Sequence, residues 1–150
     1  MFRLAEDSEE QLAGYLDLGQ VLVARHDGET LGHLQLIPTD EAGTVELKSM
    51  AVLEGHRGHG IGRALVDEAV RRSAGDGRTR MLVSTAAADV GALRFYQRTG
   101  FRMLSVERDA FTPATGYPDS IVIDGIELRD RVWLDRDLTT GGPPQRGSGA

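Results

Sequence analysis

Cysteine is absent from this sequence of 150 residues. The chain can therefore form no disulfide and no thiolate metal site, and it can carry no acyl group as a cysteine thioester. Acyl transfer by a ping-pong route through cysteine is excluded. Any such group would have to pass directly from donor to acceptor.

Long hydrophobic runs are also missing. No eighteen apolar residues follow one another, and the first seven, MFRLAED, are too acidic and too poor in apolar residues for a signal peptide. We therefore expect a cytoplasmic protein that does not enter a membrane. An apolar content of 40 % supports a hydrophobic core, and the length is that of one domain.

The chain has no excess of basic residues. Lysine and arginine number 17 against 23 aspartates and glutamates, which gives a net charge of -6 at pH 7. A negative chain repels a polyphosphate backbone, so we expect no nucleic-acid partner. The same charge mildly favours a cationic ligand such as an amine.

The N-terminal third predicts a strand, a helix and a hairpin. The strand covers residues 2–6, and a capping box introduces a helix over residues 8–18. Residues 20–25 and 30–37 are strand-like runs, and Asp27-Gly28 between them favours a tight turn with positive φ.

Residues 44–53 predict the central strand. Strict alternation puts Val45 and Leu47 on one face and Glu46, Met50 and Val52 on the other. Glu46 is therefore expected on the face that carries Met50.

The periodicity of apolar residues, together with residues that end helices and strands, predicts the remaining elements. They are a helix over 61–73, a strand over 80–85, a helix over 89–98 with Asp89 as N-cap, late strands over 101–108 and 131–135, and a turn at Asp124-Gly125. The segment 139–150, TTGGPPQRGSGA, is too polar to join a core, so we expect a folded domain over 1–138 followed by a disordered tail.

A glycine-rich turn separates the central strand from the following helix. In Arg57-Gly58-His59-Gly60-Ile61-Gly62, glycines let the backbone amides curl inward, and the helix N-terminus adds unpaired donors. Such a turn binds phosphate or pyrophosphate, with Arg57 and Arg63 adding charge. The alternative is a plain strand-to-helix connection in which glycine serves only tight packing.

Two known phosphate-binding motifs do not fit this turn. The phosphate loop of nucleotide hydrolases is excluded because no Gly-Lys-Ser/Thr follows. The dinucleotide fingerprint Gly-x-Gly-x-x-Gly is a poor match, since Gly58, Gly60 and Gly62 alternate and Arg63 stands at its sixth position. A nicotinamide-dependent oxidoreductase is therefore disfavoured.

Two motifs together resemble the GNAT superfamily of N-acetyltransferases. Residues 57–62 are similar to its Arg/Gln-x-x-Gly-x-Gly/Ala signature, which also lies between a central strand and its helix. Residues 89–101, DVGALRFYQRTGF, look like its Asn-x-x-Ala-x-x-x-Tyr-x-x-x-Gly-Phe segment. The match points to a generic bacterial member of that superfamily.

The resemblance implies a fold. It is a single α/β (α+β) domain with flanking helices and a mixed, mostly antiparallel, twisted sheet. The sheet is splayed between its fourth and fifth strands, here residues 45–53 and 80–85, and acetyl-CoA lies in that opening. Family analogy also suggests a homodimer, and it requires no metal.

The resemblance also assigns residues to acetyl-CoA. Main-chain groups of Met50 and Val52 would contact the pantetheine and the thioester carbonyl, and the turn would hold the pyrophosphate. The complete expected cofactor set is Met50, Ala51, Val52, Arg57, Gly58, His59, Gly60, Ile61, Gly62, Arg63 and Asp89.

Amine acetylation requires a base and benefits from an acid. An alkyl ammonium with a pKa of about 10 must lose its proton before it attacks the thioester. Glu46 matches the family position of a glutamate base, although a water chain or a solvent-facing glutamate without a role is also possible. Tyr96 is the expected acid, placed to hydrogen-bond the departing CoA sulfur, and its alternative is a core aromatic.

One position departs from the family pattern. Asp89 stands where the family usually has asparagine. Aspartate caps a helix equally well, but when ionised it cannot donate a side-chain hydrogen bond to the cofactor.

Other readings of the sequence remain open. A non-catalytic acetyl-CoA-binding module would need the glycine turn but neither Glu46 nor Tyr96.

His56 and His59 form a weak candidate metal pair without a third ligand. Aromatic residues among late acidic ones could form an acceptor site, although ordinary packing or a dimer contact is the more common role: Phe111, Tyr117 and Trp133 among Asp109, Asp119, Asp130 and Asp135. Small-molecule and peptide amines remain possible as acceptors.

Overall fold

The computed structural model describes residues 3–6, 19–56, 58, 60–118 and 120–139. The chain forms two compact units. The first comprises Met1–Met81 and Leu138–Gly141, and the second comprises Leu82–Asp137 and Gly142–Ala150. The helix expected over 8–18 and the tail expected beyond 139 lie outside the described residues.

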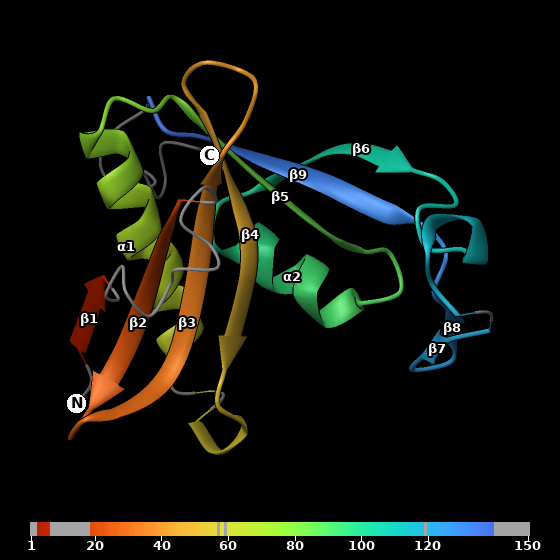
Figure 1. The fold of residues 1–150 in the computed structure, drawn as a ribbon, viewed down its shortest axis with the longest axis horizontal. Coiled ribbons are helices and arrows are strands. Elements are labelled where there is room, and N and C mark those ends of the chain that lie inside the picture. The colour runs from red at the N-terminus through yellow and green to blue at the C-terminus, as the bar shows by residue number, and fades with distance from the viewer. Residues whose placement is uncertain (1–2, 7–18, 57, 59, 119, 140–150) are drawn as a thin grey trace. The chain divides into compact units, whose positions relative to one another are not determined.

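An antiparallel sheet forms the first unit (Figure 1). Its strands lie in sequence order, β1-β2-β3-β4. Their bounds are β1 Arg3–Glu6, β2 Gln20–His26, β3 Glu29–Pro38 and β4 Thr44–Val52. The predicted strands are confirmed, with ends moved by a residue or two.

The predicted hairpin joins β2 and β3. His26 pairs with Glu29, so Asp27 and Gly28 form a two-residue turn with φ of 51° and 80°. Positive φ at both central residues matches the right-handed twist of the strands, and Asp-Gly is a preferred pair for it. The turn residues thereby fix the register of the hairpin.

Helix α1, Ile61–Gly75, packs on one face of this sheet (Figure 1). A side chain added at Gly32 would meet Ala51 O at 2.9 Å and the side chains of Ile61 and Leu65 at 3.4 Å. The helix therefore lies close to β3, and we call the side of the sheet that Gly32 faces the α1 face. Leu65 is fully buried, a contribution on the order of 2 kcal/mol.

A β-bulge in β4 corrects the predicted alternation. Gln35 pairs with Ser49, but Leu36 pairs with Leu47, so Lys48 is an extra residue in β4. The bulge reverses the side on which later residues point. Met50, opposite Leu34, therefore shares the α1 face with Leu47.

The expected placement of Glu46 beside Met50 is therefore wrong. Glu46 pairs with Ile37, whose side chain alternates with that of Leu36 and so points to the opposite face. Ser49 and Ala51 share that opposite face, since their partners are Gln35 and His33.

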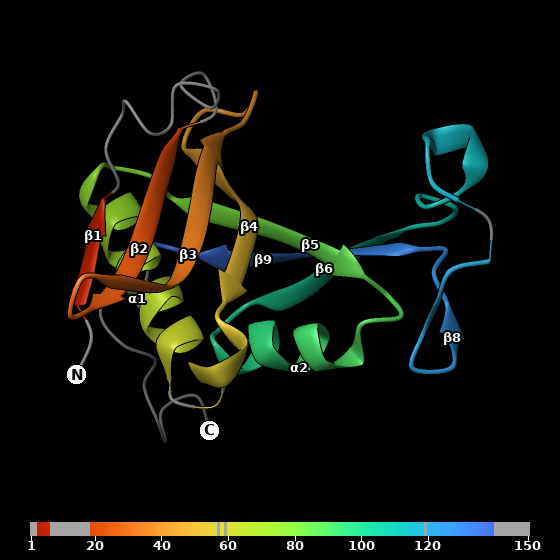
Figure 2. The same ribbon diagram turned by 60° about the horizontal axis from the view of Figure 1, so that its bottom comes forward.

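The second unit combines three strands with a helix and a small hairpin (Figure 2). Its strands lie in the order β5-β9-β6, and β6 is antiparallel to β9. The elements are β5 Arg80–Ala86, whose first two residues belong to the first unit, α2 Val90–Arg98, β6 Arg102–Glu107, β7 Val122–Ile123, β8 Ile126–Glu127 and β9 Arg131–Asp137. The turn predicted at Asp124-Gly125 joins β7 and β8, with φ of 48° and 83°.

The structure combines helices with strands, and the strands pair antiparallel throughout the first unit and between β6 and β9. The expected α+β class and the mostly antiparallel sheet are therefore confirmed.

Candidate active site

The glycine turn follows β4 in the first unit. A short 3-10 turn, Glu54–His56, precedes it, and Gly58 and Gly60 have φ of 84° and 81°. A side chain added at either glycine would meet no atom within 4 Å. Backbone conformation rather than crowding therefore favours glycine here. The expected ligands Arg57 and His59 lie outside the described residues.

The N-terminus of α1 has no side-chain cap. Gly60 is its N-cap residue in the left-handed conformation, no side-chain cap hydrogen bond forms among the described residues, and no acid stands in the first turn. Gly60 O does accept from Ala64 N at 3.0 Å, so the helical ladder starts normally. Amide donors and the positive end of the helix dipole therefore favour an anion at this point.

Ile61, Gly62 and Arg63 have different environments within this first turn. Ile61 is buried in the core, Gly62 is half-buried, and Arg63 is exposed. The Arg63 guanidinium lies 4.0 Å from the carboxylate of Asp67 one turn along the helix. An exposed pair at that distance contributes little to stability.

The end of β4 leads directly into the turn. Met50 and Val52 are half-buried on the α1 face, whereas Ala51 is exposed opposite His33. Leu53 N donates to Leu31 O at 2.7 Å, which holds the chain to β3 just before it turns.

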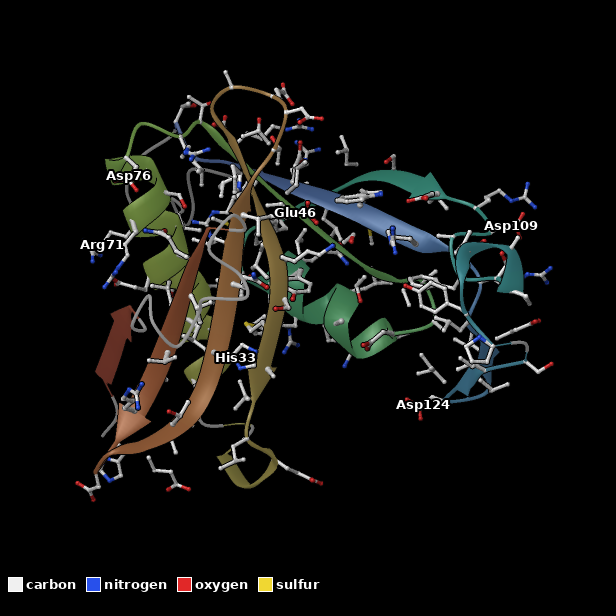
Figure 3. All side chains as sticks on the ribbon, in the orientation of Figure 1. His33, Glu46, Arg71, Asp76, Asp109 and Asp124 are labelled. Carbon is white, nitrogen blue, oxygen red and sulfur yellow. The ribbon has the colours of Figure 1, made fainter. Side chains whose placement is uncertain are left out.

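Glu46 lies near the start of β4, opposite Ile37 of β3 (Figure 3). Its side chain is half-buried on the face opposite α1, where Figure 3 also labels His33 on the neighbouring strand. Half-burial keeps water within reach of the carboxylate while one side stays packed.

Gln35 is a polar group on the same face that the sequence analysis missed. It is 9 % exposed, and the Ser49 hydroxyl donates to its Oε1 at 3.4 Å. Its Nε2 is buried and has no hydrogen-bond partner among the described residues. An unpaired buried donor costs about 1–3 kcal/mol. The signal in the sequence was a single glutamine inside the apolar run LQLI.

Tyr96 lies on α2 in the second unit. Phe95 and Phe101 pack against its ring edge to face, with ring centroids 5.2 and 5.7 Å away. Burial raises the pKa of Tyr96 to about 12, and the charge of Asp89 adds to the effect. The hydroxyl therefore stays protonated throughout the neutral range.

Asp89 caps α2 as predicted. Its carboxylate accepts a hydrogen bond from Ala92 N at 2.9 Å. This contact satisfies a first-turn amide that would otherwise lack a partner. The carboxylate is thus engaged with its own helix.

The late aromatic residues pack around a cation of the protein itself. The Arg131 guanidinium lies 4.8 Å from the centroid of the Phe111 ring and 6.0 Å from that of Trp133. Glu107 accepts from Trp133 Nε1 at 3.1 Å, and Phe111 meets Tyr117 edge to face at 5.0 Å. Arg131 therefore lies over the rings of Phe111 and Trp133, an arrangement that favours ordinary packing over an open amine site.

The described residues offer neither a cluster of metal ligands nor a membrane-spanning helix. No group of three or more potential ligand side chains occurs within the described part of the chain, and His59 of the weak histidine pair lies outside it. None of the helices that the structure describes is both long and apolar enough to cross a membrane.

Comparison with known proteins identifies the family. Residues 2–101 match the model of the Acetyltransferase (GNAT) family. The chain belongs to this family. An uncharacterized N-acetyltransferase of Bacillus subtilis (strain 168), YvbK, is 31 % identical over 135 residues, which are 90 % of this chain and 85 % of that protein.

Solved structures agree with this assignment. An IAA acetyltransferase from Bacillus cereus ATCC 14579 has a TM-score of 0.79 and 30 % identity, covering 91 % of this chain and 99 % of its own. A Bacillus subtilis acetyltransferase in complex with CoA has a TM-score of 0.80 and 26 % identity, with the same coverage. The expected GNAT membership, the N-acetyltransferase class and acetyl-CoA as co-substrate are confirmed.

Proposed function

We propose that this GNAT enzyme transfers the acetyl group directly from acetyl-CoA to a primary amine within a ternary complex. The observation that carries the proposal is the start of α1, where two glycines with positive φ lead into an uncapped helix free of acidic residues in its first turn. That arrangement suits a pyrophosphate.

Acetyl-CoA would use mainly backbone groups of this protein. Its pyrophosphate would accept hydrogen bonds from amides between Arg57 and Arg63, and the Arg63 side chain would add charge. Its pantetheine and thioester carbonyl would contact the main chain from Met50 to Val52. Asp89 is a weaker candidate ligand, because capping of α2 already engages its carboxylate.

The acceptor amine would lose its proton to Glu46, directly or through water. This carboxylate is half-buried on the face that also carries Gln35 and Ser49. The carboxylate and the Ser49 hydroxyl can accept hydrogen bonds from an ammonium group, while Gln35 Nε2 can donate to a neighbouring acceptor atom of the substrate. The acceptor would be a small-molecule or peptide amine.

Tyr96 would donate a hydrogen bond to the departing CoA sulfur. With a Tyr96 pKa of about 12, proton transfer to a thiolate whose conjugate acid has a pKa of about 8.5 is uphill by roughly 5 kcal/mol. Tyr96 would therefore stabilise developing charge on sulfur, and the thiolate would take its proton from water. A non-catalytic binding module would have no use for such a donor.

The acetyltransferase domain would extend over residues 1–138. Leu138 is 5 % exposed, and its amide donates to Thr79 O at 2.9 Å. The burial and the hydrogen bond of Leu138 support a domain that extends to this residue.

Steady-state kinetics with a panel of amines tests the proposal. Free-thiol release from acetyl-CoA is measured with polyamines, aminoglycosides, amino acids and a peptide N-terminus, varying both substrates. Direct transfer predicts intersecting double-reciprocal lines, because both substrates must be bound before either product leaves. Parallel lines would contradict the ternary complex.

Thermal stabilisation by acetyl-CoA but not by NADH checks the co-substrate, since a ligand at a hundred times its Kd adds about 2.7 kcal/mol to the free energy of unfolding.

A further inference from the structure

Gln35 is a buried polar side chain whose hydrogen bonds the protein leaves incomplete. Its Nε2 has no partner among the described residues, although the side chain is only 9 % exposed. Its Oε1 has one contact, the Ser49 hydroxyl at 3.4 Å, which is long for a bond from an O–H donor. A buried amide in this state lowers stability unless a ligand supplies the missing acceptor.

The strand neighbours of Gln35 do not supply that acceptor. Its partner on β2 is Val21, and the next residue of β3 on the same face is Ile37. Both side chains are apolar and half-buried. Its partner on β4 is Ser49, which is exposed. The unsatisfied amide therefore lies beside a surface hydroxyl, on the face opposite α1.

The same amide lies close to the proposed position of the thioester. Leu53 N donates to Leu31 O, and hydrogen-bonded positions alternate along an antiparallel strand, so the main-chain groups of Met50 point away from β3. Those groups are among the ones proposed to hold the pantetheine and the thioester carbonyl. Ser49 directly precedes Met50, so Ser49 and its partner Gln35 lie about 3.3 Å along the strand from that point.

Glu46 is farther from the thioester position. Its partner Ile37 is three residues from Leu34, the partner of Met50, which corresponds to about 10 Å along β3. In the proposed mechanism Glu46 would therefore receive the amine proton through water. The Gln35 amide and the Ser49 hydroxyl are nearer, and they can reach a substrate atom two or three bonds from the reacting nitrogen.

We propose that Gln35 and Ser49 bind a neutral carbonyl oxygen on the carbon next to the one that bears the acceptor amine. The acceptors are then amino-acid amides and the N-termini of peptides, and amines without such an oxygen are poor substrates. This inference rests on the proposed acetyl transfer, because it concerns the acceptor of that reaction.

The chemistry of the two side chains fits a carbonyl oxygen. The last torsion of a glutamine side chain has a broad range, so the amide can turn Nε2 toward Ser49 and the surface. Nε2 and the Ser49 hydroxyl can then both donate to one carbonyl oxygen, which has two lone pairs and no proton to place. A neutral oxygen fits better than a carboxylate, because Glu46 carries negative charge on the same face.

Two amines of equal shape test this oxygen-binding site. Glycinamide and 2-methylpropylamine share one arrangement of non-hydrogen atoms, but only glycinamide has a carbonyl oxygen. Each amine is compared between variants in the thiol-release assay, so the difference in basicity between the amines cancels. Gln35→Met should lower kcat/KM for glycinamide by about tenfold and leave kcat/KM for 2-methylpropylamine unchanged. Glycylglycinamide distinguishes the two sources of the oxygen, since a much higher kcat/KM for the dipeptide would identify peptides as acceptors.

The matched control is a second glutamine of the same sheet. Gln20 pairs with Leu36 and so lies on the α1 face, and Gln20→Met should change neither reaction. Urea unfolding adds a readout that a structural role would move in the other direction. Because Gln35→Met removes an unpaired buried donor, this variant should be at least as stable as the wild type. A less stable Gln35→Met that loses activity equally with both amines would overturn the proposal.

Calorimetric titration of glycinamide in the presence of CoA separates this inference from acetyl transfer. Glycinamide binding that weakens in Gln35→Met, in an enzyme that releases thiol with no amine, would support the oxygen-binding site and overturn the proposed transfer. Thiol release with glycinamide that is equal in the wild type and Gln35→Met would overturn the oxygen-binding site and leave the proposed transfer in place. A wild type that does not bind glycinamide would also overturn the site.

Discussion

Helices α1 and α2 begin differently. Gly60 at the start of α1 has no side chain to accept hydrogen bonds from first-turn amides, whereas Asp89 at the start of α2 provides a carboxylate for Ala92 N. One helix start therefore suits an external anion, and the other is satisfied by the protein itself. The difference supports the proposed pyrophosphate site at the start of α1, and in the proposed mechanism α2 contributes a side chain, Tyr96.

Removal of the Tyr96 hydroxyl should have the largest effect. Tyr96→Phe keeps the ring that packs against Phe95 and Phe101, so the fold should persist. We expect kcat to fall by roughly a hundredfold or more, with the KM for acetyl-CoA nearly unchanged, because the hydroxyl is proposed to act on the leaving sulfur. An undiminished kcat in the thiol-release assay would remove Tyr96 from the mechanism.

Burial of the same hydroxyl predicts a stability change at high pH. The folded pKa of Tyr96, about 12, exceeds the ordinary value of about 10, so stability is complete below pH 10 and falls as pH rises from 10 to 12. Two pKa units correspond to roughly 3 kcal/mol. Urea unfolding of the wild type should show this loss, and Tyr96→Phe should lack most of it.

A second tyrosine serves as the control for the high-pH measurement. Tyr117 is 37 % exposed, so Tyr117→Phe should leave the pH dependence of the wild type in place. Equal pH profiles for the wild type and Tyr96→Phe would show that the hydroxyl is not buried from water in solution.

An acidic residue at the start of α1 should come next in size. Gly60→Asp would put a carboxylate where the ligand pyrophosphate is proposed to bind. We expect the Kd for CoA to rise by about thirtyfold, on the order of 2 kcal/mol, through charge repulsion and capping of the same amides.

The matched control for this substitution is neutral. Gly60→Asn has nearly the same shape, and asparagine tolerates the positive φ of 81° at Gly60. Calorimetric titration with CoA should therefore show a much smaller loss of affinity for Gly60→Asn. Equal losses for the two variants would attribute the effect to backbone strain instead of charge.

The sequence predicted the local elements well because their signals are local. Asp27-Gly28 defines a hairpin turn, Asp89 defines a helix start, and the apolar periodicity of residues 61–73 defines α1. The two motifs that resemble the GNAT superfamily also led to the correct family.

Features that depend on pairing between strands could not be predicted in the same way. The bulge at Lys48 arises from how β4 pairs with β3, and no residue type in β4 predicts a bulge at that position. A rule of strict alternation consequently put Glu46 on the wrong face. Gln35 was missed because its burial and its unpaired amide depend on neighbours distant in sequence.

The smallest predicted effect concerns the second helix start. Asp89→Ala removes the acceptor for Ala92 N and should cost about 1 kcal/mol of stability in urea unfolding. Asp89→Asn retains an acceptor oxygen and restores the residue most common in the family, so its stability should stay near that of the wild type.

The Asp89→Asn substitution should also lower the pKa of Tyr96, because the charge of Asp89 helps to raise it. If Asp89→Asn instead strengthened CoA binding severalfold, the residue would belong to the cofactor site as well as to the helix cap, and the contrast between the two helix starts would be weaker than the structure indicates.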